Sequence, residues 1–198
     1  MSQVLLGGTA IGIKTRNLVI LGSDKMYLSG NLAFSNDVKK IYKITDNSYI
    51  AAAGLIADMQ ELVREVRYVL GNRRMLLGRD LTVKSTAKIV SVILYGNKGL
   101  PLYTQLLVGG YDTGPRLYSL DSLGSVMEDD YVAIGSGAET AIGLIDNRYR
   151  EDLGEEELEQ LILSAFKSVA KRDVLTGYTI DLVTISKSGS KEKRVSLM

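Results

Sequence analysis

The sequence of 198 residues contains no cysteine and no histidine. Their absence excludes disulfide bonds, thiolate nucleophiles, zinc sites built from Cys and His, and any catalytic triad with a histidine base. If the chain hydrolyses a substrate, its base must therefore be a carboxylate, a lysine or a terminal amine.

Long apolar runs and surplus charge are lacking too. No apolar run approaches the roughly 18 to 20 residues that a membrane-spanning helix needs, and the first eight residues, MSQVLLGG, lack the basic region of a signal peptide. The net charge is only +1, so neither nucleic acid nor an anionic membrane is attracted by bulk charge. We therefore expect a cytoplasmic protein that binds neither.

Only two prolines occur, and no Ser/Pro-rich linker divides the chain. The length suits a single domain with a substantial core. Alternating and β-branched residues predict paired strands at 9–24 and 40–53, and again at 103–121 and 124–137. Apolar residues at three- and four-residue steps predict four helices. These helices are expected at 55–71, 82–96, 138–149 and 155–172, and a final strand is expected at 179–186.

Strands and helices are thus grouped along the chain instead of alternating, which argues against a doubly wound parallel sheet. Several strands are apolar on both faces (VIL, IAAA and LLV), as expected where a sheet is covered on both sides. The sequence therefore predicts an α+β protein with a four-layer αββα arrangement, in which two antiparallel sheets pack together between helix pairs.

Several segments, taken in order, resemble proteasome β subunits of the archaeal type. They are GGTAIGIK, the Asp24-Lys25 pair, KKIYKI, AAAGLIAD, the block LLVGGYDTGPRLYSLDSLGSVMEDDYVAIGSGAE, NRYREDL, and KRDVLTG followed by IDLVTI. KKIYKI alone would be weak, whereas the long block from Leu106 to Gly137 is specific. The resemblance spans residues 8 to 187, nearly the whole chain.

The family resemblance implies the N-terminal nucleophile fold, which is the same αββα sandwich. It also implies a threonine endopeptidase whose propeptide is cut autocatalytically before the threonine. The freed α-amine then serves as the base, or assists it, because such an amine titrates near pKa 7.7–8.0. No histidine is required, and no metal or organic cofactor is implied.

The resemblance also implies roles for individual residues. Lys40 matches the lysine whose charge lowers the pKa of the nucleophilic hydroxyl, and Asp24 matches the carboxylate that pairs with this lysine. Gly54 matches the glycine whose backbone N–H stabilises the oxyanion. Without the resemblance, Lys40 would be taken as part of a solvated face and Asp24 as a turn residue.

Three further polar residues match the group that supports the terminal amine: Ser136, Asp173 and Thr176. A substrate pocket is expected at Ala52, Ile56 and Leu28. The small side chain of Ala52 would leave this pocket deep, which suits large apolar residues.

The nucleophile itself is in question, because the spacings to the matched residues fit without gaps only when the count starts at Gly8. A count that starts at Thr9 makes every one of these spacings one residue too short. A one-residue slip also turns a strand side chain to the opposite face of the sheet. Three explanations stay open. The chain is a naturally silent subunit, or Thr9 is the nucleophile and a local bulge restores the register, or an original threonine at position 8 was exchanged for glycine by engineering.

We expect residues 1–8 to form a propeptide-like leader and residues 9–198 to form a single N-terminal-nucleophile domain. As implied by the resemblance, the chain is a β subunit in a seven-membered ring of a 20S proteasome core that degrades unfolded polypeptides. Its partners would be the α ring, other β subunits and, through the α ring, a regulatory ATPase. The alternatives are a non-catalytic ring subunit that supports an active β partner, and a relative of the simpler two-ring bacterial enzymes.

Overall fold

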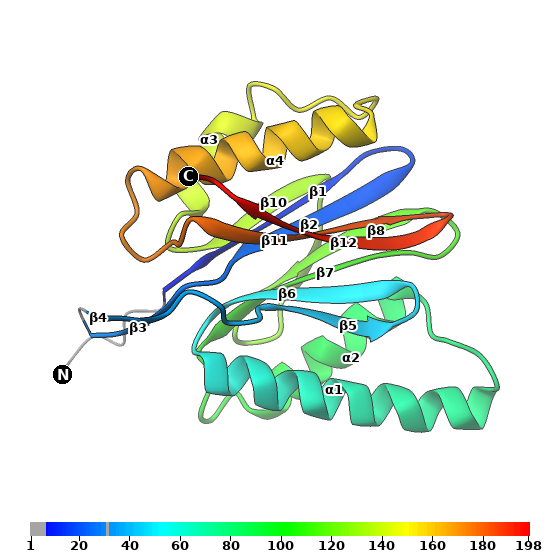
Figure 1. Ribbon diagram of the computed structural model, residues 1–198. Helices are drawn as coiled ribbons and strands as arrows, with labels where there is room; N and C mark the ends of the chain where they lie inside the picture. Colours follow the sequence, from blue (N-terminus) through cyan, green and yellow to red (C-terminus); the bar gives the residue numbers. More distant parts are fainter. Residues whose placement is uncertain (1–6, 31) are drawn as a thin grey trace.

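The computed structural model describes residues 7–30 and 32–198. Two antiparallel sheets lie face to face, with α3 (Ala138–Ile145) and α4 (Glu155–Ala170) on one outer side and α1 (Ile56–Leu77) and α2 (Val83–Gly96) on the other (Figure 1). This arrangement confirms the α+β four-layer sandwich that the grouping of elements predicts.

The first sheet contains five strands in the order β10-β1-β2-β11-β12, all antiparallel. Their bounds are β10 Tyr131–Gly135, β1 Thr9–Lys14, β2 Leu18–Asp24, β11 Thr179–Ser186 and β12 Gly189–Ser196. The central strands β1 and β2 are buried almost throughout, because the second sheet covers one face and the α3–α4 helices cover the other.

The second sheet also contains five antiparallel strands, in the order β5-β6-β7-β8-β9. Their bounds are β5 Ile41–Thr45, β6 Ser48–Gly54, β7 Thr104–Tyr111, β8 Pro115–Leu120 and β9 Val126–Glu128. A separate two-stranded hairpin, β3 (Tyr27–Ser29) with β4 (Leu32–Ser35), projects beyond the sandwich (Figure 1).

Three apolar clusters fill the spaces between the layers. One joins α1 and α2 to the second sheet, another joins α3 and α4 to the first sheet, and the third lies between the two sheets. Alternation along the strands explains this division, since Ile11 and Ile13 face the α3–α4 side while Ala10 faces the other sheet. The packed layers hold the ends of β1, β2, β6 and β10 close together at one edge.

Two helix ends differ from the sequence prediction by more than three residues. The first helix does not end at Gly71 but continues to Leu77, and Gly78 ends it in the left-handed conformation with φ of 65°. A glycine within an otherwise favourable helix costs only about 1 kcal/mol, which the buried apolar stripe offsets. The third helix is shorter than predicted and ends at Ile145. By contrast, α2 begins as predicted, with the Thr82 hydroxyl accepting a hydrogen bond from the Ser85 N–H at 3.1 Å.

The strand pairing predicted at 124–137 is wrong. Strand β9 pairs with β8 in the second sheet, whereas β10 pairs with β1 in the first sheet. The short β3–β4 hairpin and the charged edge strand β12 have no counterpart among the predicted elements. Within the described residues, no helix is both long enough and apolar enough to span a membrane.

Candidate active site

The residues singled out in the sequence meet where several strands begin or end. Strand β1 starts at Thr9, β2 ends at Asp24, and Lys40 directly precedes β5. Ser136 lies between β10 and α3, and Asp173 and Thr176 lie in the loop between α4 and β11. Hydrogen bonds hold these segments together in two groups of residues, one around the Asp24 carboxylate and one around the Asp173 carboxylate.

The Asp24 carboxylate is completely buried and accepts four hydrogen bonds. Its Oδ1 atom accepts from the Lys40 ammonium and from the Thr9 backbone N–H, each at 2.9 Å. Its Oδ2 atom accepts from the backbone N–H groups of Met26 at 2.9 Å and Gly177 at 3.1 Å. One carboxylate therefore ties the ends of β1, β2 and β5 to the loop before β11.

Lys40 and Asp24 form an ion pair whose side chains are 1% and 0% exposed. Removing two charges from water costs several kcal/mol for each ion, so such a pair persists only with good geometry and additional hydrogen bonds. The backbone donors to Asp24 supply those bonds. A buried, positioned ammonium beside a strand terminus is also the kind of group that could stabilise an alkoxide or lower the pKa of a neighbouring hydroxyl.

Gly8 lies directly in front of this ion pair. A Cβ built on Gly8 would overlap the Lys40 Nζ atom and would lie only 2.9 Å from Asp24 Oδ1, so the flexible end of Lys40 would have to shift to admit a side chain. Residue 8 therefore occupies the position from which a side chain would meet the charged pair. The backbone of Gly8 has φ of +96°, a conformation that side-chain-bearing residues rarely adopt.

The Thr9 hydroxyl belongs to a different environment. It shares a hydrogen bond with the Thr176 hydroxyl at 2.7 Å and accepts one from the Gly137 backbone N–H at 3.0 Å. Thr9 is completely buried. Because successive strand residues point to opposite faces, its side chain lies on the other side of β1 from the position beside Lys40.

The Asp173 carboxylate organises the second group. It accepts hydrogen bonds from the Ser136 hydroxyl at 2.6 Å, from the Leu175 backbone N–H at 3.0 Å and from the Thr176 hydroxyl. The Ser136 backbone N–H and hydroxyl also donate to the Gly8 carbonyl oxygen, at 3.1 and 3.3 Å. The structure thus brings Ser136, Asp173 and Thr176 together beside residues 8 and 9.

Gly54 ends strand β6, with φ of +129°. A Cβ at this position would run into the Tyr103 carbonyl oxygen and the Thr104 Cα atom. Close packing of β6 against β7 therefore requires a glycine here, independently of any role of its backbone N–H in stabilising an oxyanion. Within the described residues, no hydrogen bond joins Gly54 to Gly8 or Lys40.

The three residues expected to line a substrate pocket lie in different surroundings. Leu28 of the β3–β4 hairpin is half-buried and lies 3.9 Å from a Cβ built on Gly7. Ala52 is completely buried in the cluster beneath α1 and α2, and Ile56 packs against the same cluster. Leu28 therefore approaches the chain leading into the site, and the Ala52 backbone N–H donates to the Lys40 carbonyl oxygen at 3.0 Å.

Two backbone donors, those of Gly137 and Gly177, were not anticipated from the sequence. The N–H groups of Gly137 and Gly177 fix Thr9 and Asp24, and both glycines follow matched residues in the segments GSGAE and LTG. Across residues 7–30 and 32–198, no group of three or more acidic side chains is placed to hold a metal ion.

Comparisons with known proteins identify relatives over nearly the full length of the chain. A family profile described as proteasome subunit matches residues 4–185. Proteasome subunit beta 1 of Desulfurococcus amylolyticus is 45% identical over 196 residues, which cover 98% of this chain and 97% of the relative. Proteasome subunit beta 1 of Staphylothermus marinus is 40% identical over 93% of this chain and 87% of the relative. Proteasome subunit beta 2 of Pyrobaculum calidifontis is 38% identical, covering 98% and 97% respectively.

Proposed function

The chain belongs to the proteasome subunit family, and from this premise we propose that it is a β subunit of the proteasome core that has lost its own nucleophile. It keeps the surroundings of a threonine-type peptidase site without the attacking hydroxyl. Its role in the ring would then be structural, supporting a second β subunit that carries an active threonine.

The observation that carries this proposal is the environment of residue 8. A side chain there would contact the Lys40 ammonium and the Asp24 carboxylate, but glycine provides none. The hydroxyl of the next residue, Thr9, is bonded to Thr176 and Gly137 instead. An activated nucleophile needs to lie within hydrogen-bond reach of its activating group.

The remaining residues support the chemistry that a hydroxyl at position 8 would perform. Its oxygen would attack the Gly7 carbonyl carbon, so that an ester forms, the Gly7–residue 8 C–N bond breaks and the leaving nitrogen gains a proton. Water would then hydrolyse the ester and release the leader, leaving a free α-amine and a free hydroxyl. Lys40 would stabilise the developing oxyanion of the nucleophile, and Ser136, Asp173 and Thr176 would position the new amine.

Backbone geometry favours this cleavage in a restored chain. The φ angle of residue 8 involves the carbonyl carbon of Gly7, so the angle exists only while that peptide bond is intact. A β-branched residue held at φ of +96° is strained by about 1–3 kcal/mol, and cutting the bond removes the constraint. The predicted leader, residues 1–8, lies largely outside the described residues, which begin at Gly7.

The test restores the missing side chain with Gly8→Thr, and Gly8→Ala is the matched control because it adds only the Cβ atom. The chains are assembled with their ring partners, and peptide hydrolysis is measured beside the mass of the N-terminus. We expect the Gly8→Thr chain to lose residues 1–7 and to gain turnover. The wild type and Gly8→Ala should keep the leader and remain inactive, as should Gly8→Thr combined with Lys40→Ala.

Turnover by the wild-type chain itself, with a free Thr9 terminus, would overturn the proposal. It would establish the second candidate function, in which Thr9 is the nucleophile. One observation favours that candidate: Ser136 donates twice to the Gly8 carbonyl, the group that Thr9 would attack in self-cleavage. The complete burial of Thr9 weighs against it, because a substrate carbonyl must reach the hydroxyl.

The partners proposed for this subunit follow from the same premise. They are an α ring on one side, neighbouring β subunits within a seven-membered ring, a regulatory ATPase acting through the α ring, and unfolded polypeptides as substrates of the assembled core. The cytoplasmic location expected from the sequence stays a prediction.

A further inference from the structure

The edge strand β12 is tied to the segment that carries Lys40 by four ion pairs, which form a closed network. The members are two cations, Lys25 and Arg194, and two carboxylates, Asp37 and Asp181. Lys25 Nζ lies 3.1 Å from Asp37 Oδ1 and 2.6 Å from Asp181 Oδ2. The Arg194 guanidinium lies 3.2 Å from Asp37 Oδ1 and 3.0 Å from Asp181 Oδ1. Each cation therefore contacts both carboxylates.

The four members come from four different parts of the fold. Lys25 directly follows β2, Asp37 lies in the irregular segment between β4 and β5, Asp181 is in β11 and Arg194 is in β12. Asp181 and Arg194 are opposite each other in the strand register, so their side chains are neighbours on one face of the sheet. The network therefore joins the edge of the first sheet, where β12 lies (Figure 1), to the segment that leads into the second sheet.

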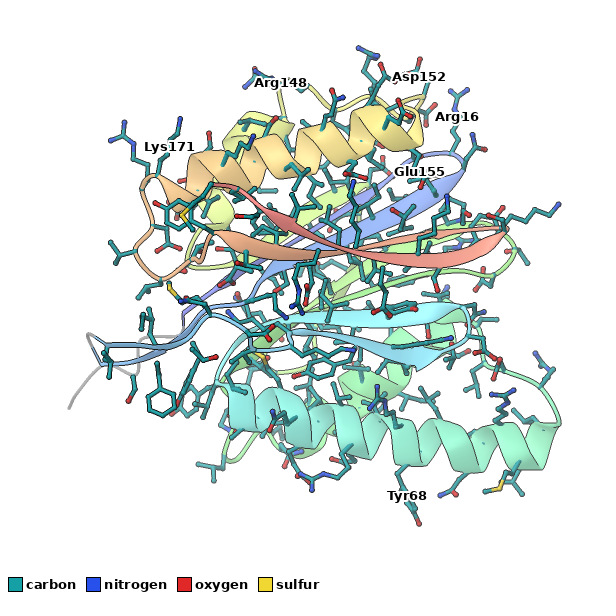
Figure 2. All side chains as sticks on the ribbon, in the orientation of Figure 1. Arg16, Tyr68, Arg148, Asp152, Glu155 and Lys171 are labelled. Carbon is teal, nitrogen blue, oxygen red and sulfur yellow. The ribbon has the colours of Figure 1, made fainter. Side chains whose placement is uncertain are left out.

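Exposure to solvent is graded across the network. A lysine such as Lys171 points away from the body of the molecule (Figure 2), but the Lys25 side chain is only 3% exposed. Asp181 is 22% exposed, whereas Arg194 and Asp37 are 57% and 70% exposed. Burying an ammonium costs free energy unless carboxylates neutralise its charge. Lys25 is therefore the inner member of the network, and Arg194 closes it from the outside.

The same two chain segments carry the buried Asp24–Lys40 ion pair. Lys25 follows Asp24 in the chain, and Asp37 precedes Lys40 by three residues. Between these side-chain contacts, the Val38 backbone N–H donates to the Lys25 carbonyl oxygen at 2.9 Å. The segment before β5 forms neither helix nor strand, so it depends on contacts of this kind for its position. A change in the network is therefore passed on to Lys40.

Ion pairs at a protein surface often contribute little, because solvent and salt screen the charges and long side chains lose freedom. This network differs from such pairs in two respects. Lys25 is buried and needs counter-charges, and one arginine loses its side-chain freedom only once while it contacts two carboxylates. The hydrogen bond and charge of Lys25, together with the charge of Arg194, also lower the pKa of the Asp37 carboxyl. Both cations thus act on this carboxylate although it is exposed.

We propose that Arg194 is a positioning residue, which holds the Lys40 ammonium beside residue 8 through Asp37 and Lys25. Arg194 touches neither the substrate nor the reacting atoms. Strand β12 thereby fixes the segment that carries the activating charge of the site. The proposal rests on the proposed function for the task of Lys40, which is to stabilise the oxyanion of a hydroxyl at position 8. The contacts themselves are those of the wild-type chain.

The first test uses the full wild-type chain and follows hydrogen exchange of the Val38 amide and the Lys40 ammonium by NMR. In Arg194→Gln, both groups should exchange about 3- to 10-fold faster, because two partly exposed ion pairs are lost. Added salt should speed exchange in the wild type and less so in the variant. The matched control is Arg116→Gln, which breaks an exposed pair with Glu128 on β8, three strands from β5. It should change neither rate.

Two further substitutions test the path through Asp37. Arg194→Lys keeps the charge and should restore part of the slow exchange. Asp37→Asn should speed exchange by itself, but it should add less in the Arg194→Gln chain than in the wild type, since both changes break the same ion pair. Equal rates in Arg194→Gln and the wild type, an equal acceleration in Arg116→Gln, or fully multiplicative effects of the two substitutions would overturn the proposal.

Turnover provides a readout that a purely structural role would not move. In assembled rings that carry Gly8→Thr, Arg194→Gln should lower kcat by about 3- to 10-fold and change KM by less than about twofold, because Lys40 acts on the transition state. An unchanged kcat in active rings would show that Arg194 does not position Lys40. If the Gly8→Thr rings are inactive, the proposed function fails, and the exchange rates of the wild-type chain still decide the role of Arg194.

Discussion

Strand β1 separates two polar half-sites that differ in what they contain. On one side, the Asp24–Lys40 ion pair faces residue 8, which has no side chain. On the other side, Thr9 has a hydroxyl, but it is buried against Thr176 and the Gly137 N–H. The ion pair therefore has no hydroxyl from residue 8 beside it, and the Thr9 hydroxyl is not bonded to Lys40 or Asp24.

The Asp24 side of this comparison has a structural role of its own. Asp24 accepts backbone hydrogen bonds from Thr9, Met26 and Gly177 in addition to the Lys40 ammonium. Losing this carboxylate would leave buried donors without acceptors, and this holds whether or not the site hydrolyses peptides. Both half-sites should therefore be tested for their contribution to folding, starting with the side that carries the charges.

The largest effect is expected from Asp24→Ala. The substitution leaves the Lys40 ammonium buried without a counter-ion and orphans three backbone N–H groups, so the free energy of unfolding should fall by about 3–5 kcal/mol. Urea unfolding of the purified chain measures this fall. The control is Asp37→Ala, which removes an exposed carboxylate and should change stability by less than about 1 kcal/mol. A similar fall in the free energy of unfolding of the two variants would show that the buried Asp24 carboxylate stabilises the fold no more than an exposed one does.

Lys40→Met should be the next most damaging change, because it leaves the Asp24 carboxylate buried without its cation. The expected loss is about 3 kcal/mol. Combining it with Asp24→Asn, which keeps an oxygen acceptor but removes the charge, should restore part of the stability. The double variant should therefore unfold at higher urea than Lys40→Met alone. If the two losses simply add, the ion pair is not coupled in the folded protein.

The four-layer fold could be predicted because it follows from local patterns. Strand alternation, helical periodicity and the grouping of elements each indicate the same architecture. The errors occur where tertiary contacts decide instead. The chain crosses from one sheet to the other between β9 and β10, although only Asp129 and Asp130 separate the two strands. That crossing depends on the pairing of β10 with β1, which a local pattern does not encode.

The site could be predicted only in part, for a related reason. The side chains of Asp24, Lys40, Ser136, Asp173 and Thr176 were identified through family resemblance, and the structure places them in two connected groups. The backbone donors Gly137 and Gly177 were missed, since any residue type supplies an N–H and the sequence gives no direct signal for its direction. The register argument at Gly8 stays a prediction, although the Thr9 hydroxyl is bonded to Thr176 and Gly137 and not to Lys40.

On the hydroxyl side of β1, Thr9→Val should cost about 1–2 kcal/mol. Valine has nearly the same shape, but it leaves the Gly137 N–H without its acceptor and removes one of the two hydrogen bonds of the Thr176 hydroxyl. Thr9→Ser keeps the oxygen and should cost less, through the loss of one buried methyl group. Urea unfolding ranks the three chains. In assembled rings carrying Gly8→Thr, Thr9→Val should retain turnover, whereas its loss would indicate that Thr9 takes part in the chemistry.

The smallest effect is expected from Ser136→Ala. Ser136 is exposed to solvent, so water can replace its hydroxyl as the donor to Asp173 and to the Gly8 carbonyl. The free energy of unfolding should fall by no more than about 1 kcal/mol. In the Gly8→Thr chain, however, the same hydroxyl would help to position the new α-amine, so turnover should fall more than stability does. A Ser136→Ala chain that loses stability and turnover in equal proportion would assign this residue to the scaffold alone, because a positioning role requires turnover to respond more strongly than folding.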